Sequence, residues 1–469
     1  MTDSHDVIII GGGSAGYAAA RTAREAGASV GIVDHGPLGG LCILRGCMPS
    51  KAILRSSDIA SLIRRAPEFG LHSANLQVNL AAIIDRKNRL IKEFAEDRIQ
   101  ALQHPRFTLY RERAHFVSPT IIQAGPHRLS AKAYIIATGS VVSRIAIPGL
   151  EEAGYLTSDE ALELGTMPKS MIVLGGGPVA LELGQFFARL GIQVTLLQRS
   201  AHILSQTDED LVQPVEAHLR AEGMQVYTNT QIQRISTAGG QKTVHFLHQG
   251  HPRQVTATTI LQALGRRPNI DPLNLDAAKV ATQKEAIQIS KDMRTSQPHI
   301  FAVGDVNGLH QIVHIAIEEG EIAGWNAVHP DQPPKHYDDR LNTLVVFTDP
   351  QVASVGVSER ECRHRHIPYL SASYPFNDHG KALCLGETYG HVKVLCHPHS
   401  GEILGGHIVG PEASELIHEL IAIMYFHGTA HDLLRIPHYH PTLAEILTYP
   451  AEELAGKLPP ARDNRVHSS

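Results

Sequence analysis

The sequence predicts an α/β protein with two parallel-sheet domains and a smaller α+β domain after them. Two observations lead to this prediction. An apolar strand-like run, a glycine-rich turn and a helix-forming stretch follow one another twice, near residue 10 and near residue 175. Beyond about residue 337, short strand-like runs mix with helical stretches such as residues 413–427, and no such glycine-rich unit recurs.

The first unit is expected to bind a dinucleotide. Its parts are a strand at residues 7–10, the turn Gly11-x-Gly13-x-x-Gly16, a helix at 17–26, a strand at 29–33 and Asp34. In this strand-turn-helix order the pattern is specific. The glycines of the turn let the helix N-terminus meet a pyrophosphate, and the Asp34 carboxylate accepts a ribose hydroxyl.

The second unit repeats this order. Its parts are a strand at residues 171–174, the turn Gly175-x-Gly177-x-x-Ala180, a helix at 181–190, a strand at 194–197 and Gln198. Gln198 stands where the first unit has its acid. Two Rossmann-like folds predict two dinucleotides, and the alternative is one dinucleotide beside a decayed copy.

Between the two units, Cys42 and Cys47 lie in a glycine-rich stretch that includes Gly40. We expect a helix to begin near Lys51, with Ser50 as its cap. A thiol beside a helix N-terminus ionises more easily than a free thiol, whose pKa is about 8.5. The spacing favours a redox-active dithiol, and the alternatives are two unrelated buried cysteines or half of a metal site.

Three further segments are expected to return to the sheets or to follow them. The first is residues 135–140, which include Thr138 and Gly139, and the second is residues 263–269, which include Gly265 and Arg266. The third is a strand at residues 300–305 that ends in Gly304 and Asp305. A helix at residues 311–326 is expected to follow it. Linkers are expected at Pro148-Gly149 and at residues 332–334. The predicted domains are residues 1–147 and 271–336 for the first fold, 148–270 for the second and 337–469 for the third.

Composition excludes several classes of protein. The chain is 43% apolar and 19% charged, with a formal net charge of -5, so no basic surface for nucleic acid is expected. No run approaches the ~18 apolar residues of a membrane span, and the N-terminus does not resemble a signal peptide. Five cysteines make no structural disulfide framework, so we expect a cytoplasmic protein without membrane partners.

Taken together, these residues resemble the FAD-dependent pyridine nucleotide-disulfide oxidoreductases, which include dihydrolipoamide dehydrogenase, glutathione reductase and mercuric reductase. The resemblance covers nearly the whole chain and implies FAD at the first unit and NAD(P)H at the second. The residues expected to contact these cofactors are Gly11, Gly13, Ser14, Ala15, Gly16, Asp34, Gly40, Lys51, Thr138, Gly139, Gly175, Gly177, Gln198, Arg199, Gly265, Arg266, Gly304, Asp305, His314 and Ala316.

The resemblance also implies the catalytic residues. Lys51 matches the lysine near the reactive flavin nitrogen, and Glu182 matches its ion-pair partner, although Glu182 could also be an ordinary surface carboxylate. His440 and Glu445 match the His-Pro-Thr-x-x-Glu motif of disulfide-reducing members. In those proteins the last domain forms a homodimer, and the histidine reaches the dithiol of the other subunit.

The implied reaction passes electrons from NAD(P)H through FAD to Cys47 and opens a Cys42–Cys47 disulfide. Cys42 then attacks a small-molecule or protein-bound disulfide, and His440, oriented by Glu445, protonates the departing thiol. Dihydrolipoamide oxidation is the reverse of this sequence. No resident metal ion is expected.

Two positions depart from the family pattern. Leu41 stands where threonine is usual, so one hydroxyl contact to the flavin is lost. Gln198-Arg199 resembles the NADP-binding members, because an arginine can hold the 2′-phosphate. NADP-binding members have a second arginine six residues later, but this chain has Ser205 at that position, with His202 nearby. NADP(H) is therefore favoured over NAD(H) as the coenzyme, without being exclusive.

Two other functions remain open. Residues 186–199 are most similar to mercuric reductase, which indicates a reductase of a metal ion or another acceptor, but the C-terminal tail has no cysteine pair to pass on Hg(II). The second open function is that of a slow redox-sensing or metal-binding flavoprotein dimer, which is suggested by His397, His399 and His407. Cys362, Cys384 and Cys396 are expected to be structural, and the tail after residue 458 to be loose.

Overall fold

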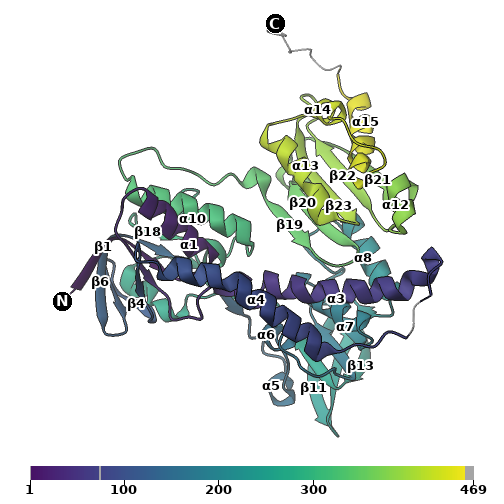
Figure 1. Cartoon of the computed structure of the whole chain (residues 1–469), viewed down its shortest axis with the longest axis horizontal. Coiled ribbons are helices and arrows are strands. Elements are labelled where there is room, and N and C mark those ends of the chain that lie inside the picture. Colours follow the sequence, from purple (N-terminus) through teal and green to yellow (C-terminus); the bar gives the residue numbers. More distant parts are fainter. Residues whose placement is uncertain (1, 73–74, 460–469) are drawn as a thin grey trace.

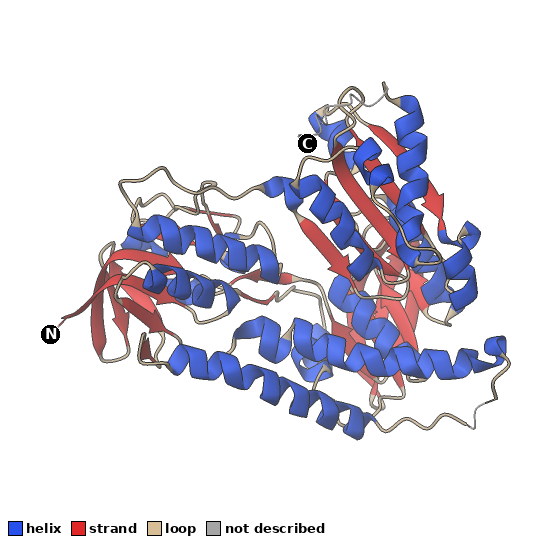
Figure 2. Cartoon of the chain, turned by 45° about the horizontal axis from the view of Figure 1, so that its top comes forward, coloured by secondary structure: helices blue, strands red, loops and turns tan. Residues whose placement is uncertain are grey.

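The computed structural model describes residues 2–72 and 75–459, so the expected loose tail lies almost wholly outside the described residues. Three main sheets of seven, four and five strands, each with its own helices, and three smaller sheets make up the described part of the molecule (Figure 1). Two long helices, α3 (Cys47–Arg65) and α4 (Leu80–Gln103), pack together and run across the middle of Figure 1 and the lower part of Figure 2. Among the described residues, no helix is both long and apolar enough to cross a membrane.

The first sheet carries the first glycine-rich turn. Its strand order is β3 (Thr108–Tyr110), β2 (Val30–Val33), β1 (Thr2–Ile10), β6 (His127–Ile136), β5 (Ile121–Ala124) and β4 (Ala114–Ser118), with β18 (Ile300–Ala302) also paired to β6. β1, β2, β3, β6 and β18 run parallel. Residues 7–10 are buried, as parallel strands covered on both faces require.

Two helices cross closely on one face of this sheet. They are α1 (Ser14–Glu25) and α10 (Val313–Val328), which lie side by side in Figure 1. A Cβ on Gly320 would lie 2.3 Å from the Ala15 carbonyl oxygen, and one on Gly324 would lie 2.6 Å from that of Ala19. Glycine at these two positions therefore permits the close crossing.

The second sheet is parallel and has the order β10 (Gln225–Tyr227), β9 (Gln193–Leu197), β8 (Ser170–Leu174) and β14 (Thr259–Gln262). Its main helices are α7 (Pro178–Arg189) and α8 (Glu209–Ala221). An antiparallel sheet of β11 (Thr230–Ala238), β12 (Gln241–His248) and β13 (His251–Ala257) adjoins it. A ribbon of β7 (Ser140–Val142) and β15 (Arg266–Pro268) connects the first two folds.

The third sheet is antiparallel, with the order β19 (Thr343–Val346), β20 (Gln351–Gly356), β23 (Ile403–Gly410), β22 (His391–Cys396) and β21 (Leu370–Pro375). Its helices are α11 (Glu359–Arg365), α12 (Gly380–Leu385), α13 (Ala413–Tyr425), α14 (Ala430–Arg435) and α15 (Thr448–Lys457). The remaining short elements are α2 (Gly40–Arg45), α5 (Leu150–Ala153), α6 (Ser158–Ala161), α9 (Leu275–Ala278), β16 (Thr282–Gln283) and β17 (Ala286–Ile287).

The sequence placed several helix starts too late. α1 begins at Ser14 and α7 at Pro178, so the glycine patterns run into the helices, and Gly16 lies inside α1 rather than in the turn. α3 begins at Cys47 instead of near Lys51, with Gly46 as its N-cap. Pro49 is accepted there because first-turn N–H groups have no partner within the helix. Ser50 is not the cap, and its hydroxyl donates to the Cys47 carbonyl at 3.0 Å.

Candidate active site

The two candidate redox thiols lie at the junction of α2 and α3. Cys42 is partly buried in α2, and Cys47 is exposed as the first residue of α3. A thiol hydrogen bond from Cys42, the positive charge of Lys51 and backbone N–H groups together lower the pKa of Cys47 to about 6. The same pair interaction and burial raise the pKa of Cys42. The dithiol therefore has one thiolate near neutral pH, on Cys47.

A partly buried ion pair lies one turn beyond Cys47. Lys51 Nζ is 2.9 Å from Glu182 Oε2, and the Glu182 side chain is only 6% exposed, so Glu182 is no ordinary surface carboxylate. Its other oxygen accepts the backbone N–H of Phe347 at 3.0 Å. Lys51 also lies 4.4 Å from the centre of the Phe347 ring. Residues from α3, α7 and the segment after β19 thus fix the lysine beside the thiolate.

The first glycine turn has the shape that a dinucleotide pyrophosphate requires. Gly11 has φ +105°, and a Cβ there would lie 2.3 Å from the Ala137 carbonyl oxygen. A Cβ on Gly16 would lie 1.8 Å from the Gly11 carbonyl oxygen. A Cβ on Gly40 would lie 2.7 Å from Gly13 Cα, so the dithiol stretch begins against the N-terminus of α1.

Asp34 lies at the end of β2, next to this turn. Its carboxylate oxygens accept the backbone N–H groups of Gly12 at 2.7 Å and Gly36 at 2.6 Å. Ser14 and Ala15 form the first turn of α1, whose N-terminal N–H groups favour an anion. These residues therefore fit the pyrophosphate and ribose of FAD.

A second group of polar residues lies where β18 ends. Asp305 accepts the hydroxyl of Ser140 at 2.6 Å, and Arg266 donates to the same serine. Thr138 donates to the Asn269 carbonyl at 2.8 Å, while Gly139 adopts φ +68° beside it. The structure thus brings the three returning segments together next to the first fold.

Buried groups surround the start of α10. Glu319 accepts the Gly304 N–H at 2.6 Å and the Asn307 amide at 2.8 Å, and burial raises its pKa to about 7. Burial lowers the pKa of His314, which precedes the buried Ala316 by two residues in the first turn.

The second glycine turn lacks an acid. Gly175 has φ +113°, and a Cβ there would lie 2.4 Å from the Ala263 carbonyl oxygen. The Gln198 side chain covers Gly176 much as the Asp34 carboxylate covers Gly12. Arg199 is exposed, and Gly177 caps α7 with nothing near the Cβ position. Gly265, three residues after β14, adopts φ +111°.

The predicted histidine–glutamate pair forms in the third domain. His440 Nδ1 is 2.9 Å from Glu445 Oε1, and the His440 side chain is 79% exposed. The Thr442 N–H and His440 lower the pKa of Glu445. Among the described residues, no hydrogen bond or ion pair joins His440 to Cys42 or Cys47 of the same chain. The structure of one subunit therefore leaves His440 apart from the dithiol.

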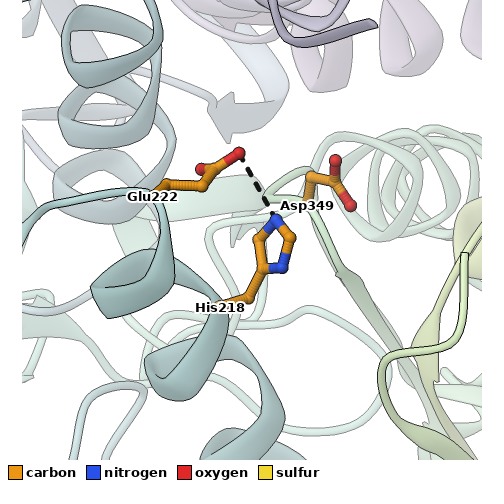
Figure 3. A group of neighbouring side chains, drawn as sticks. All are labelled: His218, Glu222 and Asp349. Carbon is orange, nitrogen blue, oxygen red and sulfur yellow. Dashed lines mark ion pairs between the residues drawn. The ribbon is translucent and has the colours of Figure 1, made fainter. Parts of the chain in front are cut away.

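One group of side chains has metal-ligand character, namely His218, Glu222 and Asp349 (Figure 3). Figure 3 shows the His218 ring turned toward Glu222, from which Nε2 lies 3.3 Å away. However, the buried Arg189 already pairs with Glu222 at 2.7 Å, with Asp349, and with Asp58 at 2.9 Å. A guanidinium thus holds the cation position, and the group is an ion network that ties α3, α7 and α8 to the third domain.

Other sequence expectations have mixed outcomes. Cys362 and Cys396 are buried, as a structural role predicts, but Cys384 is exposed. His407 is buried with Nε2 3.0 Å from the Val357 carbonyl, so it does not join His397 and His399 in a metal-ligand group.

Sequence reasoning missed Phe347, Glu319 and Arg189. Each contacts residues more than ten positions away, and no local spacing marks such partners.

The family assignment comes from comparison with known proteins. A family model for pyridine nucleotide-disulphide oxidoreductase matches residues 5–320, and the model for the dimerisation domain of such proteins matches residues 343–451. Mercuric reductase from Lysinibacillus sphaericus is 35% identical over 418 residues, 89% of this chain and 76% of that protein. Dihydrolipoyl dehydrogenase from Chlamydia trachomatis is 31% identical over 429 residues, 90% of each chain.

Solved structures agree in fold. LpdA from Mycobacterium tuberculosis superposes with a TM-score of 0.87 at 25% identity, covering 97% of this chain and 100% of that one. The Cu(II) complex of the HOCl-induced flavoprotein disulfide reductase RclA from Escherichia coli superposes with a TM-score of 0.85 at 24% identity. The match covers 97% of this chain and 100% of that one. The chain belongs to the pyridine nucleotide-disulphide oxidoreductase family of FAD-binding oxidoreductases with a redox-active disulfide, and its dimerisation domain implies a homodimer.

Proposed function

We propose that this protein is an NAD(P)H-dependent disulfide reductase in which Cys42 and Cys47 transfer electrons to a disulfide substrate. The observation that carries this proposal is the thiol pair at the start of α3, with the pKa of Cys47 lowered to about 6. Lys51, held by Glu182, keeps a positive charge beside that thiolate.

FAD would be held by the turn Gly11–Gly16, Asp34, Gly40, the Ser140–Asp305–Arg266 group and the start of α10. When bound, FAD would supply the two-electron chemistry that links the nicotinamide to a disulfide. The chain's own residues bind and orient it. The α1 N-terminus offers N–H groups to the pyrophosphate, and the Lys51 ammonium favours negative charge close to Cys47.

The thiol steps balance without another reactant. The Cys42 thiol, whose pKa is raised, first gives its proton to a nearby base. The thiolate so formed attacks one sulfur of the substrate disulfide, forms a mixed disulfide and releases the first thiolate. The Cys47 thiolate then attacks the Cys42 sulfur, forms the Cys42–Cys47 disulfide and releases the second thiolate. Each released thiolate takes up a proton, so one NAD(P)H and one proton yield two thiols.

We infer that the proton donor for the first departing thiolate is His440 of the partner subunit. The exposed imidazole and its bond to Glu445 support this role, because the carboxylate fixes the tautomer and raises the basicity of the ring. A homodimer in which the third domains meet would then contain two active sites, each built from both subunits.

The coenzyme is proposed to be NADPH rather than NADH. Gln198 takes the position of the ribose-binding acid, and the exposed Arg199 follows it. A charge-assisted contact to the 2′-phosphate contributes about tenfold to a hundredfold in affinity. Reduction of the enzyme by NADPH and NADH in parallel tests this preference, and faster reduction by NADH contradicts it.

A second candidate function is reduction of a metal ion such as Hg(II). The 35% identity to mercuric reductase favours it. The two candidate functions differ in whether they need His440 as a proton donor. His440→Ala should reduce disulfide turnover about 100-fold or more, in line with general acid catalysis, and hardly slow metal reduction.

Steady-state turnover tests the proposal. With NADPH and a disulfide, we expect at least about 1 s⁻¹, the lower end of ordinary enzyme rates. Cys42→Ser should abolish disulfide turnover while leaving reduction of the flavin by NADPH intact. Disulfide turnover by Cys42→Ser at the wild-type rate would contradict the proposal, and turnover far below 1 s⁻¹ with every disulfide would favour a redox-sensing role.

A further inference from the structure

The loop after β9 is bonded to the second glycine turn. We call residues 199–207 the coenzyme loop, because Gln198, at the proposed ribose position, comes directly before them. Within this loop, the N–H of the buried Leu204 donates to the Gly176 carbonyl at 2.8 Å. The loop and the glycine turn therefore border each other, and a shift of the loop changes the surface offered to a dinucleotide.

The third domain contacts this loop through one arginine. Arg360, the second residue of α11, donates from Nη1 to the Ser205 carbonyl at 2.9 Å and from Nη2 to Gln206 Oε1 at 2.9 Å. The donors of a guanidinium have a fixed planar geometry, so two such bonds set direction as well as distance. Because Ser205 directly follows Leu204, these bonds hold the loop next to the point where it meets the glycine turn.

A buried carboxylate at the end of the loop makes the second contact. Asp208 directly follows the coenzyme loop, and its side chain is only 5% exposed. Its oxygens accept the backbone N–H groups of Glu359 at 3.1 Å and Arg360 at 3.2 Å, and Lys393 Nζ of β22 lies 3.0 Å away. Burial opposes ionisation, but the bonds from Lys393 and the Arg360 N–H lower the pKa of Asp208, so it is charged at neutral pH.

The buried lysine ties the two domains together. Lys393 is 2% exposed and also pairs with Asp210 of α8 at 2.9 Å and Glu359 of α11 at 3.5 Å. Separating one partner of a buried ion pair is costly, so these contacts resist movement of α8 against α11. We name Arg360, Asp208 and Lys393 the interdomain clamp.

We propose that the interdomain clamp is a positioning device through which the third domain sets the affinity for NAD(P)H. By holding residues 199–207 against the glycine turn, it keeps Gln198 and Arg199 ordered before the coenzyme binds, which lowers the entropic cost of binding. The clamp acts through the loop, so NADPH and NADH should depend on it equally. This inference rests on the proposed function, in which the coenzyme is the reductant.

Substitution of Arg360 tests the proposal without emptying a buried position, because Arg360 is exposed. In anaerobic flavin reduction by Arg360→Gln, the coenzyme concentration that gives half the limiting rate should rise about three- to tenfold, equally for NADPH and NADH. The limiting rate should not change, and Arg360→Lys should recover part of the loss. Arg365→Gln is the matched control, since Arg365 is exposed on the same helix, pairs with Glu361 and loses the same charge.

Two outcomes of this experiment would overturn the inference. One is an unchanged half-saturating concentration of both coenzymes in Arg360→Gln. The other is a rise for NADPH alone, which would place the guanidinium at the 2′-phosphate instead of at the loop. Flavin reduction needs no disulfide, so failure of the proposed function is seen separately, as normal flavin reduction without turnover of any disulfide.

Binding and hydrogen exchange give readouts that do not depend on turnover. Calorimetric titration of the oxidised holoenzyme with NADP⁺ should show the same three- to tenfold loss of affinity in Arg360→Gln and none in Arg365→Gln. Amide hydrogen exchange of the peptide that spans residues 199–207 should be faster in Arg360→Gln, while that of α1 is unchanged. Faster exchange throughout the chain would show a merely structural role, and unchanged exchange of the loop would contradict the inference.

Discussion

At the scale of single residues, the position of Cys47 decides the chemistry. Because α3 begins at Cys47 rather than four residues later, the thiol lies in the first turn, where N–H groups without helical partners favour a negative charge. Lys51 adds to this effect from the next turn. The two thiols thereby differ, since Cys42 lies in α2, before α3 begins, and the pKa of its thiol is raised.

The thiolate of Cys47 should therefore titrate well below an ordinary thiol. In Cys42→Ser, where the serine hydroxyl can still donate a hydrogen bond, the rate of alkylation should rise with a midpoint near pH 6, compared with about 8.5 for a free cysteine. Lys51→Met should raise the midpoint by about one pH unit, and Lys51→Arg should keep it low. A midpoint near 8.5 in Cys42→Ser would contradict this reading of the site.

Glu319 should make stability depend on pH. Its pKa is about 7 in the folded protein and about 4.5 when unfolded, so the folded state holds the proton more tightly. Its contribution is complete below pH 4.5 and is lost as pH rises through 7, by up to about 3 kcal/mol. Glu319→Gln keeps an oxygen acceptor for Gly304 and Asn307, so its Tm advantage over wild type should be larger at pH 8 than at pH 5. An advantage that does not grow with pH would contradict this assignment.

At the scale of elements, the crossing of α1 and α10 positions residues that are proposed to bind FAD. The crossing brings the start of α10 next to the first turn of α1 and depends on Gly320 and Gly324. The sequence shows both glycines, but their role follows only from the opposing carbonyl oxygens of Ala15 and Ala19, which belong to another helix.

Gly320→Ala should therefore destabilise the protein by about 1–3 kcal/mol and lower its FAD content, because the new Cβ meets a backbone oxygen. Gly456→Ala is the control, since Gly456 lies in α15 with nothing near its Cβ position, and alanine there should stabilise by up to about 1 kcal/mol. Thermal unfolding and the ratio of flavin to protein absorbance measure both effects. Equal Tm changes in the two variants would count against the close crossing.

Local sequence patterns predicted which helices and strands form better than they predicted the residues at which these elements begin and end. The β-branched run at residues 7–10 and the glycine turns identified both Rossmann-like folds. Pro49-Ser50 was misread as a helix start, because a proline is accepted anywhere in a first turn and Gly46 can cap without a side chain.

At the scale of the whole molecule, one segment of the third domain connects three parts of the site. The Phe347 N–H donates to Glu182, and Glu182 pairs with Lys51. Two residues after Phe347, the Asp349 carbonyl accepts from Gln185 and its carboxylate pairs with Arg189. The third domain thus fixes the residues around the dithiol of its own chain. No spacing in the sequence indicates these partners, because they depend on how separate domains pack. The domain boundaries after residues 147, 270 and 336 stay predictions.

If each active site uses both subunits, two inactive variants should complement each other. Co-expression of Cys42→Ser with His440→Ala gives about half heterodimers, and each heterodimer has one site with Cys42 and the partner's His440 intact. We expect about a quarter of wild-type disulfide turnover from the mixture, although each variant alone has almost none. Turnover of the mixture equal to the average of the two variants would place His440 outside a shared site.

Cys47 is proposed to carry a thiolate in contact with FAD, and the visible spectrum of the flavin reports that contact. The purified flavoprotein is titrated with NADPH without oxygen while its visible spectrum is recorded. We predict a long-wavelength thiolate-to-flavin charge-transfer band that persists in Cys42→Ser and disappears in Cys47→Ser. Reduction of wild type with no such band, or a band that survives in Cys47→Ser, would contradict the account.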